Sequence, residues 1–284
     1  MMCALLLLMV AFWSGNYIAG KIALREMPPL LLAGLRIGLA GVLMAPIYAA
    51  SRRPVYARGA VRKLALLGIF GVTLNQVFFL VGLSRTSVAH AAILIGLTPI
   101  QVLLLACWRG QERMTTAQAM GMLVALAGVA LLKGFESPNA AGTTWLGDLI
   151  VLLGGLAFAI FTVFGKEMTT QYSAVTMNTF GYVGGALALA PVTLWHAARH
   201  ALANITTGAW LAVVYMALFP SLIAYLIYYY ALTHIAASRV SALSYLQPVF
   251  ATAMGVAILG EPVSLLVIAG GLVILSGVYL AERG

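Results

Sequence analysis

Residues 97–132, LTPIQVLLLACWRGQERMTTAQAMGMLVALAGVALL, decide the fold, because the chain repeats this stretch 149 positions later as LQPVFATAMGVAILGEPVSLLVIAGGLVILSGVYLA. The residues that recur in register are Pro99, Glu112, Gly121 and Gly128, which become Pro248, Glu261, Gly270 and Gly277. Over residues 82–131 the comparison needs no gap, and 12 of 50 positions are identical. Nearer the start of each half the offset is 145, so that Gly20-Lys21 matches Gly165-Lys166. The chain therefore consists of two copies of one repeat unit.

The composition indicates a membrane protein. Hydrophobic residues make up 63% of the chain and charged residues 8%, which excludes an ordinary soluble domain. Apolar runs of about 20 residues, the length of helix that crosses a bilayer core, recur along the whole chain. We expect an all-α integral membrane protein with ten transmembrane helices near residues 3–25, 29–50, 63–83, 87–108, 115–134, 146–168, 173–197, 208–231, 236–259 and 263–281.

Each half has an odd number of predicted spans, which decides how the two halves lie in the membrane. The first repeat covers residues 1–140 and the second covers residues 141–284. With five spans apiece, the second copy must enter the membrane from the opposite side. Two inverted five-helix repeats around a central cavity are an architecture in which one binding site opens alternately to two compartments.

The net charge of +9 could indicate a nucleic-acid partner, but its distribution favours the positive-inside rule instead. The predicted spans place ten basic residues on one face of the membrane and six on the other. We therefore expect both termini in the cytoplasm, a multi-pass protein of a bacterial inner membrane, and the lipid bilayer as the partner. Cys3 and Cys107 both fall at cytoplasmic helix ends, which favours two free thiols over a disulfide.

The sequence lacks the residues that intramembrane enzymes use. It contains no His-Glu-x-x-His, no Gly-x-Ser-x-Gly and no pair of mid-membrane aspartates. Residues 15–21, GNYIAGK, nearly match a phosphate-binding loop, but Ile22 stands where a hydroxyl would hold magnesium, and no strand precedes the motif. We expect no enzymatic activity, no catalytic residue, no cofactor and no metal site.

Pairs of glycines four residues apart occur at Gly34 and Gly38 and at Gly181 and Gly185, in repeat-related spans. Small residues at this spacing let helix backbones approach closely. Packing within the bundle is the favoured interpretation, and a dimer face is the alternative. The expected state is a monomer or a weak dimer.

The charged residues fall near the ends of the predicted spans, with Arg36 about two turns inside its span. Because ion-coupled pumps commonly carry a buried carboxylate, the pattern favours facilitated diffusion or exchange. We interpret His90 as a capping or packing residue, and Glu112 and Glu261 as carboxylates at helix starts. A salt bridge from Arg36 to Glu26, or snorkelling to the interface, is favoured over contact with a substrate carboxylate.

Neutral polar and aromatic side chains reach the middle of the membrane at repeat-related positions. A buried amide that faced lipid would leave its donors unsatisfied, so these groups should point inward. A central cavity is the better account of the set, although each single amide could equally join two helices. The candidate substrate-binding residues are Trp13, Asn16, Tyr17, Asn75, Gln76, Phe79, Phe158, Tyr225, Tyr228, Tyr245 and Gln247.

Two prolines interrupt predicted spans at matching places. Pro99 and Pro248 each remove one backbone hydrogen bond from a span interior, which frees a carbonyl and bends the helix. The pair could act as gates, one for each side of the membrane. Fixed curvature without motion is the alternative.

Several of these features together resemble an EamA-type unit. They are Trp13-Ser14-Gly15-Asn16, Pro28-Pro29 and Leu35-Arg36, followed by the two Leu-x-Pro motifs that end at Pro99 and Pro248. The resemblance covers the whole chain as two EamA-like repeats and implies the ten-helix branch of the drug/metabolite transporter superfamily. Members that are similar to this chain include YddG-like exporters of aromatic amino acids. The resemblance implies a carrier with a central cavity between its repeats.

The function that we predict is export of small neutral or zwitterionic metabolites, above all amino acids with apolar or aromatic side chains. Aromatic walls would bury the side chain, and amide dipoles would bind its polar groups. Export would proceed by alternating access, without an obvious carboxylate for proton coupling. The alternatives are drug or metabolite efflux, a carrier similar to nucleotide-sugar transporters, a channel, and an intramembrane enzyme.

Overall fold

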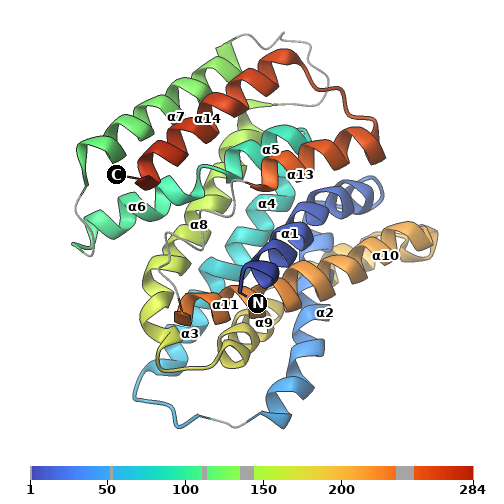
Figure 1. The fold of residues 1–284 in the computed structure, drawn as a ribbon. Coiled ribbons are helices and arrows are strands. Elements are labelled where there is room, and N and C mark those ends of the chain that lie inside the picture. Colours follow the sequence, from blue (N-terminus) through green and yellow to red (C-terminus); the bar gives the residue numbers. More distant parts are fainter. Residues whose placement is uncertain (1, 52–53, 111–113, 135–143, 235–245, 284) are drawn as a thin grey trace.

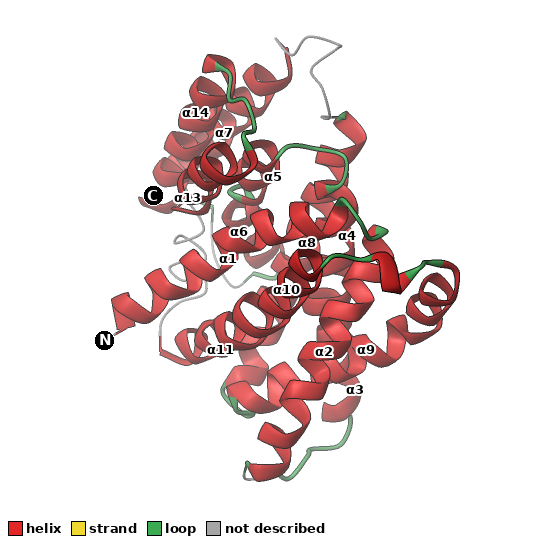
Figure 2. Cartoon of the chain, turned by 90° about the vertical axis from the view of Figure 1, so that its right-hand side faces the viewer, coloured by secondary structure: helices red, strands yellow, loops and turns green. Residues whose placement is uncertain are grey.

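The computed structural model of the chain describes residues 2–51, 54–110, 114–134, 144–234 and 246–283. Every regular element within these ranges is helical (Figure 2). The prediction of an all-α protein is therefore confirmed for the described residues. Tyr245, Glu112 and Arg113 lie outside them, so the structure says nothing about these positions.

The first half of the chain contributes eight helical elements. They are α1 (Met2–Leu24), α2 (Pro29–Ala50), α3 (Ala60–Gly68), the π-helix η1 (Ile69–Leu74), α4 (Asn75–Leu83), α5 (Val88–Ile95), α6 (Thr98–Trp108) and α7 (Thr116–Gly134). The second half contributes α8 (Trp145–Thr169), α9 (Ala174–Arg199), the 3-10 turn η2 (Leu202–Asn204), α10 (Thr207–Met216), the π-helix η3 (Ala217–Ile223), α11 (Ala224–His234), α13 (Leu246–Met254), the π-helix η5 (Gly255–Leu259) and α14 (Leu265–Arg283).

Helices long and apolar enough to cross a membrane number six in the described part of the chain. Three of them combine consecutive elements: α3, η1 and α4; α5 and α6 with the short turn between them; and α10, η3 and α11. Shorter apolar helices lie at Thr116–Gly128, Leu246–Leu259 and Leu265–Leu280. The structure thus has the several apolar helices of a multi-pass membrane protein.

Helices that are far apart in the sequence lie side by side. In Figure 1, α7 and α14 form a pair at the top, and α2 and α9 pack against each other at the bottom. Between these pairs, α4 packs on α8, while α1 packs on α10 and α11. Each contact joins an element of the first half to an element of the second, so neither half forms its core alone.

Glycines set the spacing of the α7–α14 pair. A methyl group added at Gly277 would lie 2.6 Å from the carbonyl oxygen of Gly121, and one added at Gly128 would lie 3.0 Å from that of Gly270. These are the four glycines that recur in register in the sequence. Because each one faces its partner's backbone, the two helices approach more closely than any larger residue would allow.

The glycine pairs of α2 and α9 contact neighbours within the bundle. Gly34 faces the side chain of Thr193, and Gly181 and Gly185 face the side chains of Val72 and Thr73. Gly38 differs, since a methyl group added there would meet nothing within 4 Å. Packing inside the bundle therefore accounts for three of these glycines, as expected from their spacing.

Several helices begin at a hydroxyl side chain that caps the first free N–H groups. Ser87, Thr144, Ser173 and Thr206 each accept a hydrogen bond from the backbone N–H three residues later, at the starts of α5, α8, α9 and α10. Such caps are worth about 1 kcal/mol each. They explain why these helices begin where the predicted spans do, to within a few residues.

Substitution of Gly277 tests the close helix contact. Gly277→Ala should destabilise the protein by about 1–3 kcal/mol, because the new methyl group meets backbone atoms that cannot move aside. The same change at Gly38, which faces open space, should be neutral or slightly stabilising. Thermal unfolding of the purified protein in detergent measures both variants. Equal midpoints for Gly277→Ala and Gly38→Ala would contradict the glycine contact.

Candidate functional site

Two described spans change from α-helical to π-helical geometry at repeat-related places. The segments are η1 and η3, and residues 69–74 of η1 become residues 218–223 when 149 is added. A short π-helical turn shifts the backbone hydrogen bonds by one residue and often marks a functional site. Asn75 and Gln76 follow η1 directly, and Tyr225 lies two residues after η3. The sequence pattern predicts continuous α-helical spans at both places.

The shifted backbone bonds leave carbonyl groups that side chains then satisfy. The N–H of Ala224 bonds to Phe219, five residues back, and the carbonyl of Pro220 instead accepts the indole N–H of Trp13 at 3.2 Å. In η1, the carbonyl of Gly71 accepts the hydroxyl of Tyr225 at 2.8 Å. Because an unsatisfied carbonyl is costly away from water, these bonds tie aromatic side chains to the π-helical segments.

Pro220 is the residue that explains η3. It has no backbone N–H, so the carbonyl of Met216, four residues earlier, loses its α-helical donor. The hydroxyl of Ser221 donates to that carbonyl at 2.7 Å. Pro220 could have been recognised in the sequence as a span interruption comparable to Pro99 and Pro248.

A small cavity of about 70 Å³ lies between α1, α2, α4, α5, α6, α8, α11 and α13. Both halves of the chain contribute to its walls. The lining residues are Trp13, Asn16, Tyr17, Arg36, Asn75, Gln76, Phe79, Ile95, Thr98, Gly155, Phe158, Tyr225 and Gln247.

Of the predicted binding residues that the structure describes, the lining contains all except Tyr228, while Tyr245 lies outside the described ranges. Tyr228 is fully buried behind the wall, with its ring centroid 5.1 Å from that of Phe158 and its hydroxyl 2.7 Å from that of Thr162. Thr98 was not among the predicted residues, although it is the repeat counterpart of Gln247 and could have been found in that way. Gly155 and Ile95 carried no comparable signal.

Aromatic rings form one side of the cavity. The Trp13 ring packs edge-on against Phe158 and Tyr225, with centroids 6.0 and 5.9 Å apart. Tyr17 and Phe79 form a second edge-on pair at 5.1 Å. Such rings offer both a large apolar surface and a partly negative face, which suits an apolar or aromatic ligand.

Three of the four predicted amide side chains are used to join helices. Asn75 donates to the carbonyl of Gly154 at 3.0 Å, and Gln76 donates to the hydroxyl of Tyr182 at 3.1 Å. Gln247 accepts the hydroxyl of Tyr17 at 3.3 Å.

Asn16 is different, because its buried side-chain oxygen has no hydrogen-bond partner among the described residues. It therefore retains the capacity to bind a ligand.

Arg36 is a lining residue that the sequence analysis placed elsewhere. Its side chain is 1% exposed, and its Nε donates to the hydroxyl of Ser221 at 3.0 Å. The expected salt bridge with Glu26 is wrong, since Glu26 bonds to Thr206 instead, and snorkelling to the interface is wrong because Arg36 is buried. Hydrogen bonds from the backbone N–H and the hydroxyl of Thr206 lower the pKa of Glu26 below its ordinary value. The helix N-terminus at Thr206 thus captures the carboxylate that Arg36 was expected to bind.

The predicted fourth span is interrupted beside the cavity. The helix α5 ends at Ile95, and α6 begins at Thr98, with Pro99 as its second residue. Proline cannot donate a hydrogen bond to the preceding turn, so a new helix starts there rather than a continuous one bending. Pro248 is the third residue of α13 and is buried. Whether either proline acts as a gate stays a prediction.

Buried and half-buried ionic groups connect the halves at one end of the bundle. Asp148 is only 4% exposed, and it accepts the hydroxyl of Thr86 at 2.6 Å and lies 3.5 Å from the ring of His90. Asp148 is near a helix end as expected, but its burial was not foreseen.

Glu261 joins the same end of the bundle to α1 and α5. It lies 3.8 Å from the ammonium group of Lys21, and it accepts the backbone N–H of Val88 at 2.8 Å. Its expected role as a carboxylate at a helix start is therefore borne out in kind, but the helix is α5 and not the one that follows Glu261. The left-handed turn at Gly260, with φ of 65°, precedes it, and Glu261 caps the distant helix α5 instead.

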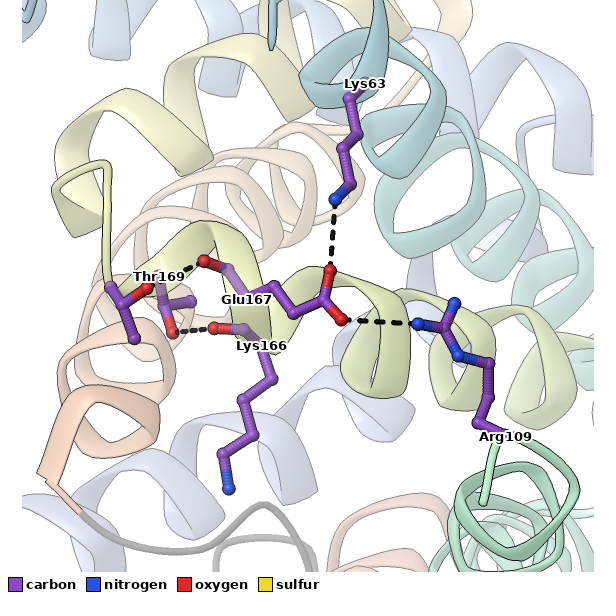
Figure 3. Close-up of polar contacts among 6 residues, drawn as sticks. Lys63, Arg109, Lys166, Glu167 and Thr169 are labelled. Carbon is purple, nitrogen blue, oxygen red and sulfur yellow. Dashed lines mark hydrogen bonds and ion pairs between the residues drawn. The ribbon is translucent and has the colours of Figure 1, made fainter. Parts of the chain in front are cut away.

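An exposed ion-pair cluster connects the halves at the other end. Figure 3 shows Glu167 of α8 between Lys63 of α3 and Arg109 after α6, each at 3.2 Å. Exposed pairs contribute about 0–1 kcal/mol each. The cluster brings together Lys63 and Arg109, two basic residues of the first half, at a glutamate of the second.

A bundle of membrane-crossing helices around an aromatic and polar cavity is the architecture of a transporter. The family comparison agrees, because residues 1–133 and 145–282 match the EamA-like transporter family. The chain belongs to this family, within the drug/metabolite transporter superfamily, and it is a multi-pass membrane transporter and not an enzyme.

Relatives cover nearly the full chain. An uncharacterized transporter of Archaeoglobus fulgidus is 31% identical over 278 residues, which span 98% of this chain and 97% of the relative. The uncharacterized transporter YyaM of Bacillus subtilis is 30% identical over 278 residues, 95% of this chain and 90% of its own. A crystal structure of a protein 21% identical in sequence matches with a TM-score of 0.68 over 99% of this chain and 96% of that one, which supports the fold.

Removal of one hydroxyl tests how the site is built. Tyr225→Phe should destabilise the protein by about 1–3 kcal/mol, because the carbonyl of Gly71 loses its donor in a buried setting. Tyr230→Phe is the matched control, since Tyr230 is 39% exposed. Thermal unfolding in detergent compares the two. If Tyr225→Phe melted with Tyr230→Phe and the unaltered protein, the proposed dependence of η1 on this hydroxyl would be wrong.

Proposed function

We propose that this protein exports small amino acids with apolar or aromatic side chains across a bacterial inner membrane. One observation carries the proposal: polar and aromatic residues chosen from repeat-related positions of both halves line a single cavity. The rings of Trp13, Phe79, Phe158 and Tyr225 would bury the substrate side chain, with Tyr228 supporting the wall from behind. Asn16 would bind a polar group of the substrate, while the other amides hold the helices that surround it.

The proposal includes ten spans arranged as two inverted five-helix repeats, residues 1–140 and 141–284. The helix contacts support it, because they match under exchange of the halves. The third span packs on the sixth as the eighth packs on the first, and the second and fifth spans pack on their own counterparts. The reciprocal pairs Gly121–Gly277 and Gly128–Gly270 repeat this symmetry within one helix contact. Both termini would then face the cytoplasm, where the basic residues are more numerous.

Transport would proceed by alternating access, with the halves rocking about the cavity. Contacts between the halves occur at both ends, through Lys21 and Glu261 at one end and through Glu167 at the other. Opening either end must separate the partners there. Pro99, which follows the interruption of its span, and Pro248 would supply the bending points.

The cavity favours amino acids over the alternative substrates. A phosphate-bearing substrate such as a nucleotide sugar would call for several cationic groups near the centre. Among the described residues that line the cavity, Arg36 is the single cation and no carboxylate is present. The same lining supports facilitated diffusion or exchange, because a proton-coupling carboxylate would be expected beside the substrate.

Counterflow in liposomes tests both carrier action and substrate class. Preloading with unlabelled phenylalanine should accelerate uptake of labelled phenylalanine, which a channel would not show. Trp13→Ala should lower the counterflow rate about tenfold, because it removes apolar surface worth roughly 1.5–3 kcal/mol of burial. Trp108→Ala is the control, since Trp108 is 77% exposed at the end of α6. Absence of acceleration with every amino acid tried would count against the substrate class.

Labelling of two loops tests the inverted arrangement. In a variant without Cys3 and Cys107, single cysteines would replace Arg58, after the second span, and Ala203, after the seventh. An impermeant thiol reagent should label Ala203→Cys in intact cells and Arg58→Cys only after the membrane is opened. Labelling of both positions from the same side would end the inverted-repeat proposal.

A further inference from the structure

Arg36 is a buried cation with unused hydrogen-bonding capacity. A guanidinium has five N–H donors and stays protonated in proteins. Here Nε bonds to Ser221 at 3.0 Å, while Nη1 is buried and has no partner among the described residues. A cation within a membrane span is strongly unfavourable without a counter-charge, so a negatively charged partner is expected for Arg36.

The described parts of the chain do not supply that counter-charge. The carboxylates whose side chains are described each have other partners: Glu26 bonds to Thr206, Asp148 to Thr86 and His90, Glu167 to Lys63 and Arg109, and Glu261 to Lys21 and Val88. The titratable groups that interact electrostatically with Arg36 are Tyr182, Tyr215 and Tyr225, which are neutral at physiological pH. Arg36, which lines the cavity, therefore has no negative partner among the described residues.

We propose that Arg36 is the carboxylate receptor of this cavity, so that the transported molecules are organic carboxylates in which an ammonium group is optional. The inference rests on the proposed function, because it names the group that the same cavity recognises. A guanidinium binds a carboxylate through parallel, charge-assisted hydrogen bonds, which are stronger than bonds between neutral groups.

The surroundings of Arg36 fix its orientation toward this role. Pro220 has no N–H to offer the carbonyl of Met216, so the hydroxyl of Ser221 donates a hydrogen bond to that carbonyl. The oxygen of the same hydroxyl accepts a hydrogen bond from Nε–H of Arg36. This chain of bonds does not involve Nη1, which stays available for a ligand. It also explains why the arginine is held within the span rather than extended to the interface.

The rest of the lining is neutral, and this makes the ammonium group dispensable. The unpartnered oxygen of Asn16 can accept an N–H from a ligand, and the faces of Trp13 and Tyr225 can receive a cation. These contacts tolerate an ammonium group but do not demand one. An aryl carboxylate without an amine should therefore bind as well as the corresponding amino acid.

A ligand series on the unaltered protein tests the proposal directly. Phenylalanine and 3-phenylpropionate should raise the thermal unfolding midpoint of the purified protein, since a ligand that binds the native state stabilises it. Phenylalaninamide and phenethylamine, which lack the carboxylate, should require concentrations at least about tenfold higher for the same shift. Equal shifts from phenylalanine and phenylalaninamide would overturn the role of Arg36 without any variant.

Variants then assign the preference to this residue. Arg36→Gln should abolish the discrimination between phenylalanine and its amide, and Arg36→Lys should retain it in weakened form. Arg25→Gln is the matched control, because Arg25 is exposed beyond the end of α1. A folded Arg36→Gln protein that kept the full preference would show that Arg36 is structural, with water as its partner, and would overturn the inference.

Failure of this inference and failure of the proposed function give different results. Counterflow of phenylalanine together with equal binding of its amide would leave amino-acid transport in place and remove the carboxylate receptor. Stabilisation by 3-phenylpropionate but by no amino acid would retain the receptor and overturn amino-acid export. A series in which no compound shifts the unfolding midpoint would overturn both.

Discussion

The structure depends on the requirement that every backbone carbonyl away from water must find a donor. Pro220 and the π-helical segments break the regular backbone pattern in the middle of two spans, and side chains complete it. Trp13 bonds to Pro220, Tyr225 bonds to Gly71, and Ser221 bonds to Met216. Trp13 and Tyr225, which complete these backbone bonds, also line the cavity, so this part of the cavity cannot be altered without disturbing the helices that carry it.

The second constraint is close contact between helices within a lipid bilayer whose interior is as apolar as the helix side chains. Burial of apolar surface gives little preference for one helix neighbour over lipid, so packing geometry must supply it. In α7 and α14, Gly128 and Gly277 bring the backbones together, and the contact joins the two halves. Elsewhere α2 packs on α9, and α1 packs on α10 and α11. The cavity exists because these contacts surround it with residues from both halves.

In the described part of the chain, the carboxylates form contacts that join different helices. Asp148, Glu167 and Glu261 all join the first half of the chain to the second, and Glu26 joins α1 to the start of α10. Arg36 alone lies in the cavity without an ionic partner. The electrostatic asymmetry of the cavity therefore comes from one residue, and the buried pair of Asp148 and His90 remains separate from it, near the end of the bundle.

The sequence by itself determined the all-helical membrane class, the repeated pattern, and most of the residues that line the cavity, because apolar length and repeat register are properties of the chain alone. Only the tertiary structure decided which polar groups are already satisfied. Asn75 and Gln76 look equivalent to Asn16 in the sequence, yet both bond to neighbouring helices. Glu26 accepts a hydrogen bond from the helix start at Thr206 and forms no ion pair with Arg36. Glu261 accepts a hydrogen bond from the start of α5, across the bundle. These outcomes could not be predicted because hydrogen-bond partners separated by 79 to 180 positions become neighbours only when the helices pack.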